Sequence, residues 1–268
     1  MKTSNPLCAS PWLEAVVTMD GRVHPCCRSE IVLGRLGKQT LQEVWRGPVA
    51  VEMRRQLARG EFPSPTCKGC YEARAHTSMS DVLDEMIAKA WRGLDTTCQP
   101  GELDRLDIAR EVVRFHAGVK ADEPRQTVVA AKDFLRVLER ARKRRPREAV
   151  AWHLARLRTL AVAALDLCNA EPSPEIVGMM RQVSLVAVCN ARCIHCVGLY
   201  NGDIVYGQQV GEKRQKRIDL PMLEAALECP QHALSFFLAG SEFFLYPGWR
   251  ELLTRFEAQG TEVAISTN

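Results

Sequence analysis

The sequence predicts an α/β protein in which a small cysteine-rich module and a helical segment precede parallel strand–helix units. Three regions that differ in composition and periodicity along the 268 residues predict this order. Residues 1–75 are rich in cysteine, glycine and proline, residues 76–180 repeat apolar side chains at helical spacing, and residues 181–268 alternate strands with helices. We therefore expect three domains with these bounds.

The first region predicts a hairpin followed by two short helices. A strand over Ala15–Met19 and a return over Arg22–Pro25 flank Asp20-Gly21, a dipeptide typical of hairpin turns. Helices are expected over Thr40–Arg46 and Val49–Arg59, because Gly47-Pro48 separates the two segments and Gly60 can end the second.

The middle region predicts a row of helices. Apolar residues recur every three or four positions in segments bounded by Pro124 and Pro146. The predicted helices cover Ser80–Arg92, Glu102–His116, Arg125–Arg145 and Arg147–Cys168. Within the third, residues 140–145 form a basic run. A solvated helix end, where cations suit the helix dipole, and a nucleic-acid contact both remain open as explanations.

The last region predicts three parallel strands joined by helices. The strands are expected over Val183–Val188, Leu234–Leu238 and Glu262–Ser266. The helices are expected over Pro221–Leu227, capped by Asp219, and over Trp249–Gln259, ended by Gly260. Parallel units of this kind place their chemistry at the carboxyl ends of the strands, and Cys189 begins a cysteine cluster at the end of the first strand.

Composition narrows the class of protein. With 46% hydrophobic and 25% charged residues the chain can build a sizeable core, and a net charge of +4 weighs against nucleic acid or a membrane as partner. The N-terminus lacks the apolar core of a secretory signal, so we expect a cytoplasmic protein. The 11 cysteines then favour metal binding or redox chemistry over disulfides. Cys98, Cys168 and Cys229 stand alone and are interpreted as spectator thiols.

Cys189, Cys193 and Cys196 form a C-x3-C-x2-C motif that resembles the radical S-adenosylmethionine (SAM) superfamily. Three thiolates leave one iron of a [4Fe-4S] cluster open. The resemblance implies that this iron chelates SAM, that SAM is cleaved to a 5′-deoxyadenosyl radical, and that the radical removes a hydrogen from the substrate. Two alternatives are thiols packed in a core and a zinc site completed by a fourth ligand.

Two later segments extend this resemblance over about 90 residues and imply further contacts with SAM. The residues Ala239, Gly240, Ser241 and Glu242 stand where the family often has Gly-Gly-Glu-Pro, with Glu242 facing the SAM amino group. Thr267 and Asn268 stand where the family often has Thr-Asn-Gly, and His195 stands where an aromatic-type residue usually lies near the adenine. Ser241 and Phe243 depart from the pattern. A family barrel usually has about six strands, so we expect a partial barrel of radical SAM type, truncated after Asn268.

The first region resembles a SPASM-type auxiliary cluster module. The resemblance rests on Cys8, the run Gly21-Arg22-Val23-His24-Pro25-Cys26-Cys27, and Cys67-Lys68-Gly69-Cys70. It implies an auxiliary [4Fe-4S] cluster on Cys8, Cys26, Cys67 and Cys70, with Cys27 as an alternate ligand. Four thiolates at this spacing are also typical of a structural zinc site, which therefore remains an alternative.

Taken together, these resemblances imply a radical SAM oxidoreductase or maturase. Its expected partners are SAM, an electron donor and a peptide or protein substrate. The alternative is a non-catalytic zinc- or iron–sulfur-binding interaction protein, or an inactive fragment.

Overall fold

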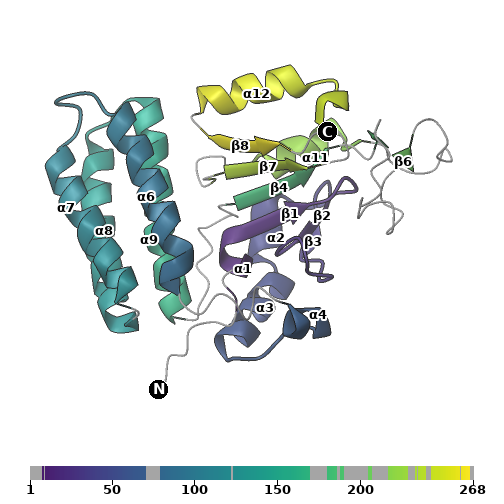
Figure 1. Cartoon of the computed structure of the whole chain (residues 1–268), viewed down its shortest axis with the longest axis horizontal. Helices are drawn as coiled ribbons and strands as arrows, with labels where there is room; N and C mark the ends of the chain where they lie inside the picture. Colours follow the sequence, from purple (N-terminus) through teal and green to yellow (C-terminus); the bar gives the residue numbers. More distant parts are fainter. Residues whose placement is uncertain are drawn as a thin grey trace.

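The computed structural model of the chain describes residues 8, 10–70, 79–121, 123–169, 180–185, 188–189, 205–206, 217–228, 233, 235–239, 243–259 and 261–265. Over these residues the protein has a mixed sheet of six strands beside a group of long helices (Figure 1). The predicted α/β class is confirmed.

The sheet combines strands from both ends of the chain. Its order is β3-β2-β1-β4-β7-β8. Strands β1, β4, β7 and β8 run parallel, whereas β2 pairs antiparallel with both β1 and β3. The strands cover β1 Glu14–Val17, β2 Arg22–His24, β3 Gly34–Arg35, β4 Met180–Ser184, β7 Ser235–Ala239 and β8 Glu262–Ile265. The N-terminal hairpin therefore extends the parallel strand–helix units as one sheet.

The first predicted strand of the last region was wrong in its bounds. The strand β4 ends at Ser184, and Cys189 lies instead in β5 (Val188–Cys189), which pairs with β6 (Val205–Tyr206) in a separate two-stranded sheet. The start of β4 was not predicted from the sequence because this part of the strand contains a polar residue, Arg181. Its side chain is only 1% exposed.

Helices α11 (Leu220–Ala226) and α12 (Trp249–Ala258) cover one face of the sheet. The rings of Phe236 in β7 and Phe256 in α12 lie 4.7 Å apart at their centroids. A 3₁₀ turn over Phe243–Leu245 precedes α12. The predicted cap of α11 is confirmed, since the Asp219 carboxylate accepts a hydrogen bond from the Met222 amide at 2.9 Å.

Four short helices surround the hairpin of the first region: α1 Ser10–Leu13, α2 Leu41–Arg46, α3 Pro48–Ala58 and α4 Pro65–Gly69. The predicted hairpin and the predicted pair of helices are confirmed. Thr40 and Glu43 form a reciprocal capping box that starts α2. Gly60, with φ of +79°, follows the end of α3.

The four predicted long helices are confirmed with shifted ends, as α6 Met79–Thr97, α7 Arg105–Lys120, α8 Pro124–Lys143 and α9 Glu148–Asn169. In Figure 1, α7 and α8 lie farther from the sheet than α6 and α9 do. Arg156 of α9 joins the helices to the sheet by donating to the carbonyl oxygen of Ala233 at 3.0 Å and the hydroxyl of Thr261 at 2.7 Å.

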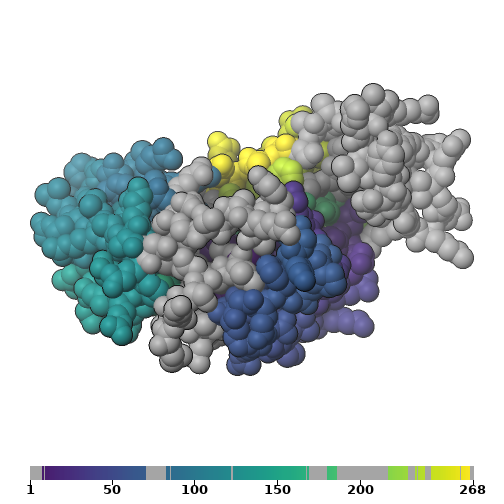
Figure 2. All heavy atoms as spheres, turned by 60° about the horizontal axis from the view of Figure 1, so that its bottom comes forward, coloured from purple at the N-terminus to yellow at the C-terminus, as the bar shows by residue number. Residues whose placement is uncertain are grey.

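In the space-filling view of Figure 2, α3 and α4 (blue) form the lower surface and α7 to α9 (teal) the surface to the left. The helices that the structure describes include none with both the length and the apolar character needed to cross a membrane.

Candidate metal centre

Four cysteines from three separate segments line one small pocket of about 30 Å³. They are Cys8, Cys26, Cys67 and Cys70, the four that were predicted as ligands of an auxiliary cluster. Much of the remaining lining is apolar, and the described lining holds no carboxylate. The other lining residues are Pro11, Arg28, Ser29, Met53, Leu57, Phe62 and Thr66.

The hairpin and the helix before it deliver the first two thiols. Cys8 lies just before α1, which leads directly into β1. Cys26 follows β2, and because β2 runs antiparallel to β1, the end of β2 lies beside the start of β1. The imidazole Nδ1 of His24 lies 3.1 Å from the carbonyl oxygen of Ser29, a hydrogen bond that closes the loop around Cys26.

The short helix α4 spaces the other two thiols. Its N-cap Ser64 accepts a hydrogen bond from the amide of Cys67 at 3.2 Å, and the amide of Cys70 donates to the carbonyl of Cys67 at 3.2 Å. Pro65 suits the first helical position, where its missing amide hydrogen is not needed. A single capped turn thus fixes the backbone that carries both cysteines.

Helix α3 forms an apolar wall of the pocket and is tied to it by a buried arginine. Met53 and Leu57 line the pocket one helical turn apart. Between them in sequence, Arg54 is 2% exposed, and it donates from Nε to the carbonyl of Pro11 at 2.7 Å and from Nη1 to the carbonyl of Trp45 at 2.9 Å. Arg54 therefore positions Pro11, which itself lines the pocket.

These non-cysteine residues were not predicted from the sequence. The four-residue spacing of Met53 and Leu57 indicates an apolar helix face, but nothing in the sequence shows that this face meets the cysteines.

Burial disfavours the charged form of two of the four thiols. It raises the pKa of Cys26 to about 12 and raises the pKa of Cys8 as well. The neighbouring thiol of Cys70 adds a small further rise at Cys8. A free thiolate is thus disfavoured at Cys8 and Cys26, so metal binding at these two sulfurs would release protons.

The alternate ligand lies apart from the four lining cysteines. Cys27 is exposed, and it does not line the pocket as its neighbour Cys26 does. None of Cys8, Cys26, Cys67 and Cys70 forms a disulfide. Among the described residues, no three His, Cys, Asp or Glu side chains converge as ligands of a single metal ion.

Most of the residues predicted to bind the second cluster and SAM lie outside the described residues: Cys193, His195, Cys196, Gly240, Ser241, Glu242, Thr267 and Asn268. The backbone is described at Cys189 in β5 and at Ala239, the last residue of β7. Ala239 pairs with Ser184, the last residue of β4, so the parallel strands β4 and β7 end at the same edge of the sheet.

Comparison with known families gives a match in the N-terminal region. Residues 8–71 match SPASM, an iron-sulfur cluster-binding domain, and the match contains all four pocket cysteines. This supports iron–sulfur cluster binding as a property of the segment. Searches of curated proteins and of solved structures found no match to the chain.

Proposed function

We propose that the chain acts as a radical SAM enzyme, or as part of one, that carries an auxiliary [4Fe-4S] cluster in its first region. The observation that carries the proposal is the pocket that Cys8, Cys26, Cys67 and Cys70 all line, inside the segment that matches the SPASM family.

The pocket suits an iron–sulfur cluster in its chemistry. Thiolates are the ligands that such clusters take, and a four-iron cluster uses four of them, one for each iron. The apolar side chains of Met53, Leu57 and Phe62 would keep water from the sulfurs. A cluster bound here would supply one-electron redox chemistry. The protein would hold it through the capped turn of α4 and the loop after β2.

The second cluster is proposed from the C-x3-C-x2-C motif and from the topology around it. Cys189, Cys193 and Cys196 would hold it, with Glu242 binding the amino group of SAM. In sequence the motif begins in β5, the next strand after β4, while Glu242 follows β7 and Thr267 follows β8; β4, β7 and β8 are adjacent parallel strands. Such strands gather the residues that follow them at one edge of a sheet. Bound there, the cluster would supply the electron that cleaves SAM, and we propose a peptide or protein as the substrate.

Anaerobic reconstitution tests both sites. Two four-iron clusters predict about eight irons per chain and a broad visible absorption band. Replacing Cys67 and Cys70 with alanine should remove about half of the iron and leave SAM cleavage measurable. Replacing Cys189 and Cys193 should remove the other half together with all formation of 5′-deoxyadenosine. Cys27→Ala is the matched control beside Cys26, because its exposed thiol lies off the pocket lining.

Metal analysis of the same proteins distinguishes the alternatives. One equivalent of zinc that is lost on replacing Cys67 and Cys70 would make the first site a structural zinc site. Wild-type iron content after replacing Cys189 and Cys193 would remove the basis for a radical SAM centre. A protein that holds both clusters and does not cleave SAM would be the non-catalytic cluster-binding protein.

A further inference from the structure

The cysteine pocket is small for the cluster that its ligands suit. Its volume of about 30 Å³ has room for about two water molecules. A [4Fe-4S] cluster places its irons and its bridging sulfides between the same four thiols. Loading of the cluster therefore requires one side of the pocket to move outward.

The side of the pocket that carries Cys8 and Cys26 is firmly packed. Cys8 lies just before α1, and all four residues of that helix are buried. Cys26 follows β2, in which Val23 is fully buried in the core. Arg54 of α3 also holds the carbonyl of Pro11 at 2.7 Å. A side built into the core in this way opens only at a high free energy.

The side formed by α4 is held much less firmly. All five residues of α4 are described and none of them is buried. A Cβ added at Gly69 would meet nothing within 4 Å. The hydrogen bonds from Cys67 to Ser64 and from Cys70 to Cys67 lie within the turn itself, and Cys67 is the residue of α4 that packs against the core. The turn can therefore move as a unit at a low free energy.

Glu30 connects α4 to the loop that carries Cys26. Hydrogen bonds from the side chains of Thr66 and Ser64 lower the pKa of the Glu30 carboxyl. Thr66 lines the pocket, and Glu30 lies in the loop between β2 and β3. Because Glu30 is exposed, water can replace its partners when the contact breaks. The contact is thus strong enough to favour a closed pocket and weak enough to open.

We propose that α4 is a lid on the cysteine pocket, held closed by the contact between Glu30 and Thr66, and that its opening admits the cluster. Opening would carry Cys67 and Cys70 away from the packed side, where Cys8 and Cys26 remain. Closing would then bring the two pairs of thiols around the cluster. The inference rests on the proposed auxiliary cluster and adds the way in which that site is loaded.

Pulse labelling of the reduced, metal-free protein with iodoacetamide tests the lid, with each cysteine followed by mass spectrometry of its peptide. Glu30→Ala and Thr66→Val both remove the contact, the second without a change of charge. Each should raise the labelling rate of all four pocket cysteines roughly two- to tenfold, from the usual net strength of a hydrogen bond. Combining them should add little, because both break one contact. The exposed Cys27 and the buried Cys98 should label as in wild type.

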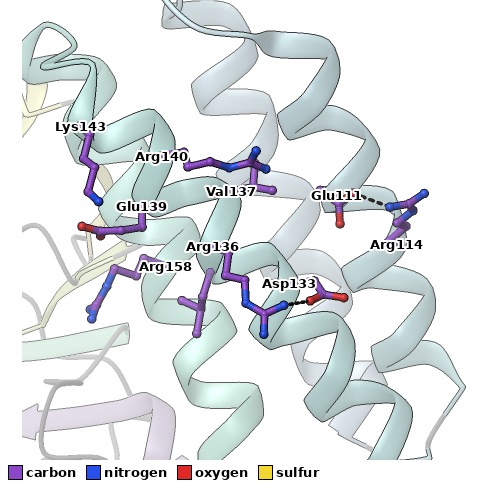
Figure 3. A pocket seen from close by; sticks show the side chains of 10 residues that line it. Glu111, Arg114, Asp133, Arg136, Val137, Glu139, Arg140, Lys143 and Arg158 are labelled. Atoms are coloured by element: carbon purple, nitrogen blue, oxygen red, sulfur yellow. Dashed lines mark hydrogen bonds and ion pairs between the residues drawn. The ribbon is translucent and has the colours of Figure 1, made fainter.

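The matched control is Glu139→Ala, in a groove of about 710 Å³ along α8 on the helical part of the molecule (Figure 3). The Glu139 carboxylate pairs with Arg142 at 2.9 Å, so this substitution also removes a charge and an exposed contact. The described lining of the groove shares no residue with that of the cysteine pocket. Labelling of the pocket cysteines should therefore stay within about twofold of wild type.

Three results would overturn the proposal. Unchanged labelling in Glu30→Ala and Thr66→Val would show that this contact does not hold the pocket closed. A rise confined to Cys67 and Cys70 would show that α4 unwinds without uncovering the pocket. A rise that reaches Cys98 as well would show that the whole protein loosens. Absence of iron from the first site of reconstituted wild type would instead contradict the proposed auxiliary cluster, whatever the labelling shows.

Discussion

At the scale of single residues, buried arginines connect parts of the chain that lie far apart in sequence. Arg181 of β4 donates from Nη1 to the carbonyl oxygen of Ala226 at 3.1 Å and also to that of Glu228, at the end of α11. Its guanidinium lies 5.5 Å from the ring centroid of Phe236. One side chain therefore satisfies carbonyls that the end of α11 leaves without helical partners.

Replacing Arg181 with methionine should destabilise the protein by about 2–4 kcal/mol. Methionine fills similar space but leaves the carbonyls of Ala226 and Glu228 buried without a donor, and each such group costs about 1–3 kcal/mol. Urea denaturation measures the loss. Arg92→Met, at an exposed position of α6, should stay within about 0.5 kcal/mol of wild type. If Arg181→Met also lowers the free energy of unfolding by no more than about 0.5 kcal/mol, other groups must satisfy these carbonyls.

At the scale of elements, local patterns predicted the helices well. In α8, Ala131, Phe134 and Leu138 are buried at the helical spacing that the sequence showed. β4 was misplaced because Arg181 and Gln182 are polar, and the helix end that accepts the arginine lies some 45 residues further along the chain. The pairing of β1 with β4 joins segments too distant for any local pattern to indicate.

The candidate metal centre shows the same division. The spacing of Cys67 and Cys70 is a local pattern that the sequence shows directly. Cys26 and Cys27 are neighbours whose side chains point in different directions, so local geometry also indicates that only one of them lines the pocket. Met53 and Leu57 reach the pocket only through the packing of α3 against α1, which Arg54 secures. That contact depends on tertiary structure, so the sequence alone did not predict it.

The hairpin turn offers a test at this scale. Gly21 and Gly60 both have φ of +79°. A Cβ added at Gly21 would lie 3.0 Å from the carbonyl oxygen of Leu36 and 2.9 Å from Sδ of Met222, whereas at Gly60 it would meet nothing within 4 Å. Gly60→Ala should therefore cost only the backbone strain of about 1–2 kcal/mol. Gly21→Ala should cost clearly more.

Chemical denaturation of the two variants compares these costs directly. Because Cys26 follows the strand that this turn begins, Gly21→Ala should also lower iron retention at the first site, while Gly60→Ala should not. Equal losses of stability would show that the loop moves away from Leu36 and Met222 at little cost.

At the scale of the whole molecule, the cysteine pocket and the carboxyl ends of the parallel strands lie at opposite edges of one sheet. Cys26 lies beside the start of β1, whereas Ala239 ends β7 and marks the opposite edge. Glu14 of β1 pairs with Met180 of β4, which in turn pairs with Ser235 of β7. Ala239 lies four residues beyond Ser235 along β7. At about 3.3 Å per residue the two edges lie roughly 13 Å apart along the strands. If the second cluster binds at that edge, as proposed, substitutions in the cysteine pocket should leave it intact.

The helices and the sheet share one hydrophobic core, and Arg156 adds a polar contact between them. Its side chain is 3% exposed, and it donates to the carbonyls of Ala233 and Gln259 and to the hydroxyl of Thr261. Burial lowers its pKa to about 10, so it stays charged at neutral pH. The acceptors lie just before β7 and β8, so Arg156 fixes the starts of both strands to α9.

Arg156→Met should therefore destabilise the protein unevenly. Removing a buried charge-assisted donor leaves up to three acceptors unpaired and should cost about 3 kcal/mol or more. Because the stacked rings of Phe115 and Phe134, 5.2 Å apart, belong to a contact between α7 and α8 alone, those helices should keep their protection. Hydrogen exchange followed by mass spectrometry should show faster exchange in β7 and β8 and wild-type exchange in α7 and α8.

Arg158→Met is the matched control, two residues further along the same helix, and should leave exchange in β7 and β8 unchanged. If Arg156→Met instead raises exchange equally in the sheet and in α7 and α8, the helices and the sheet unfold as one cooperative unit. The contact through Arg156 would then be one of many that couple them, because loss of a single dominant contact would release the strands ahead of the helices.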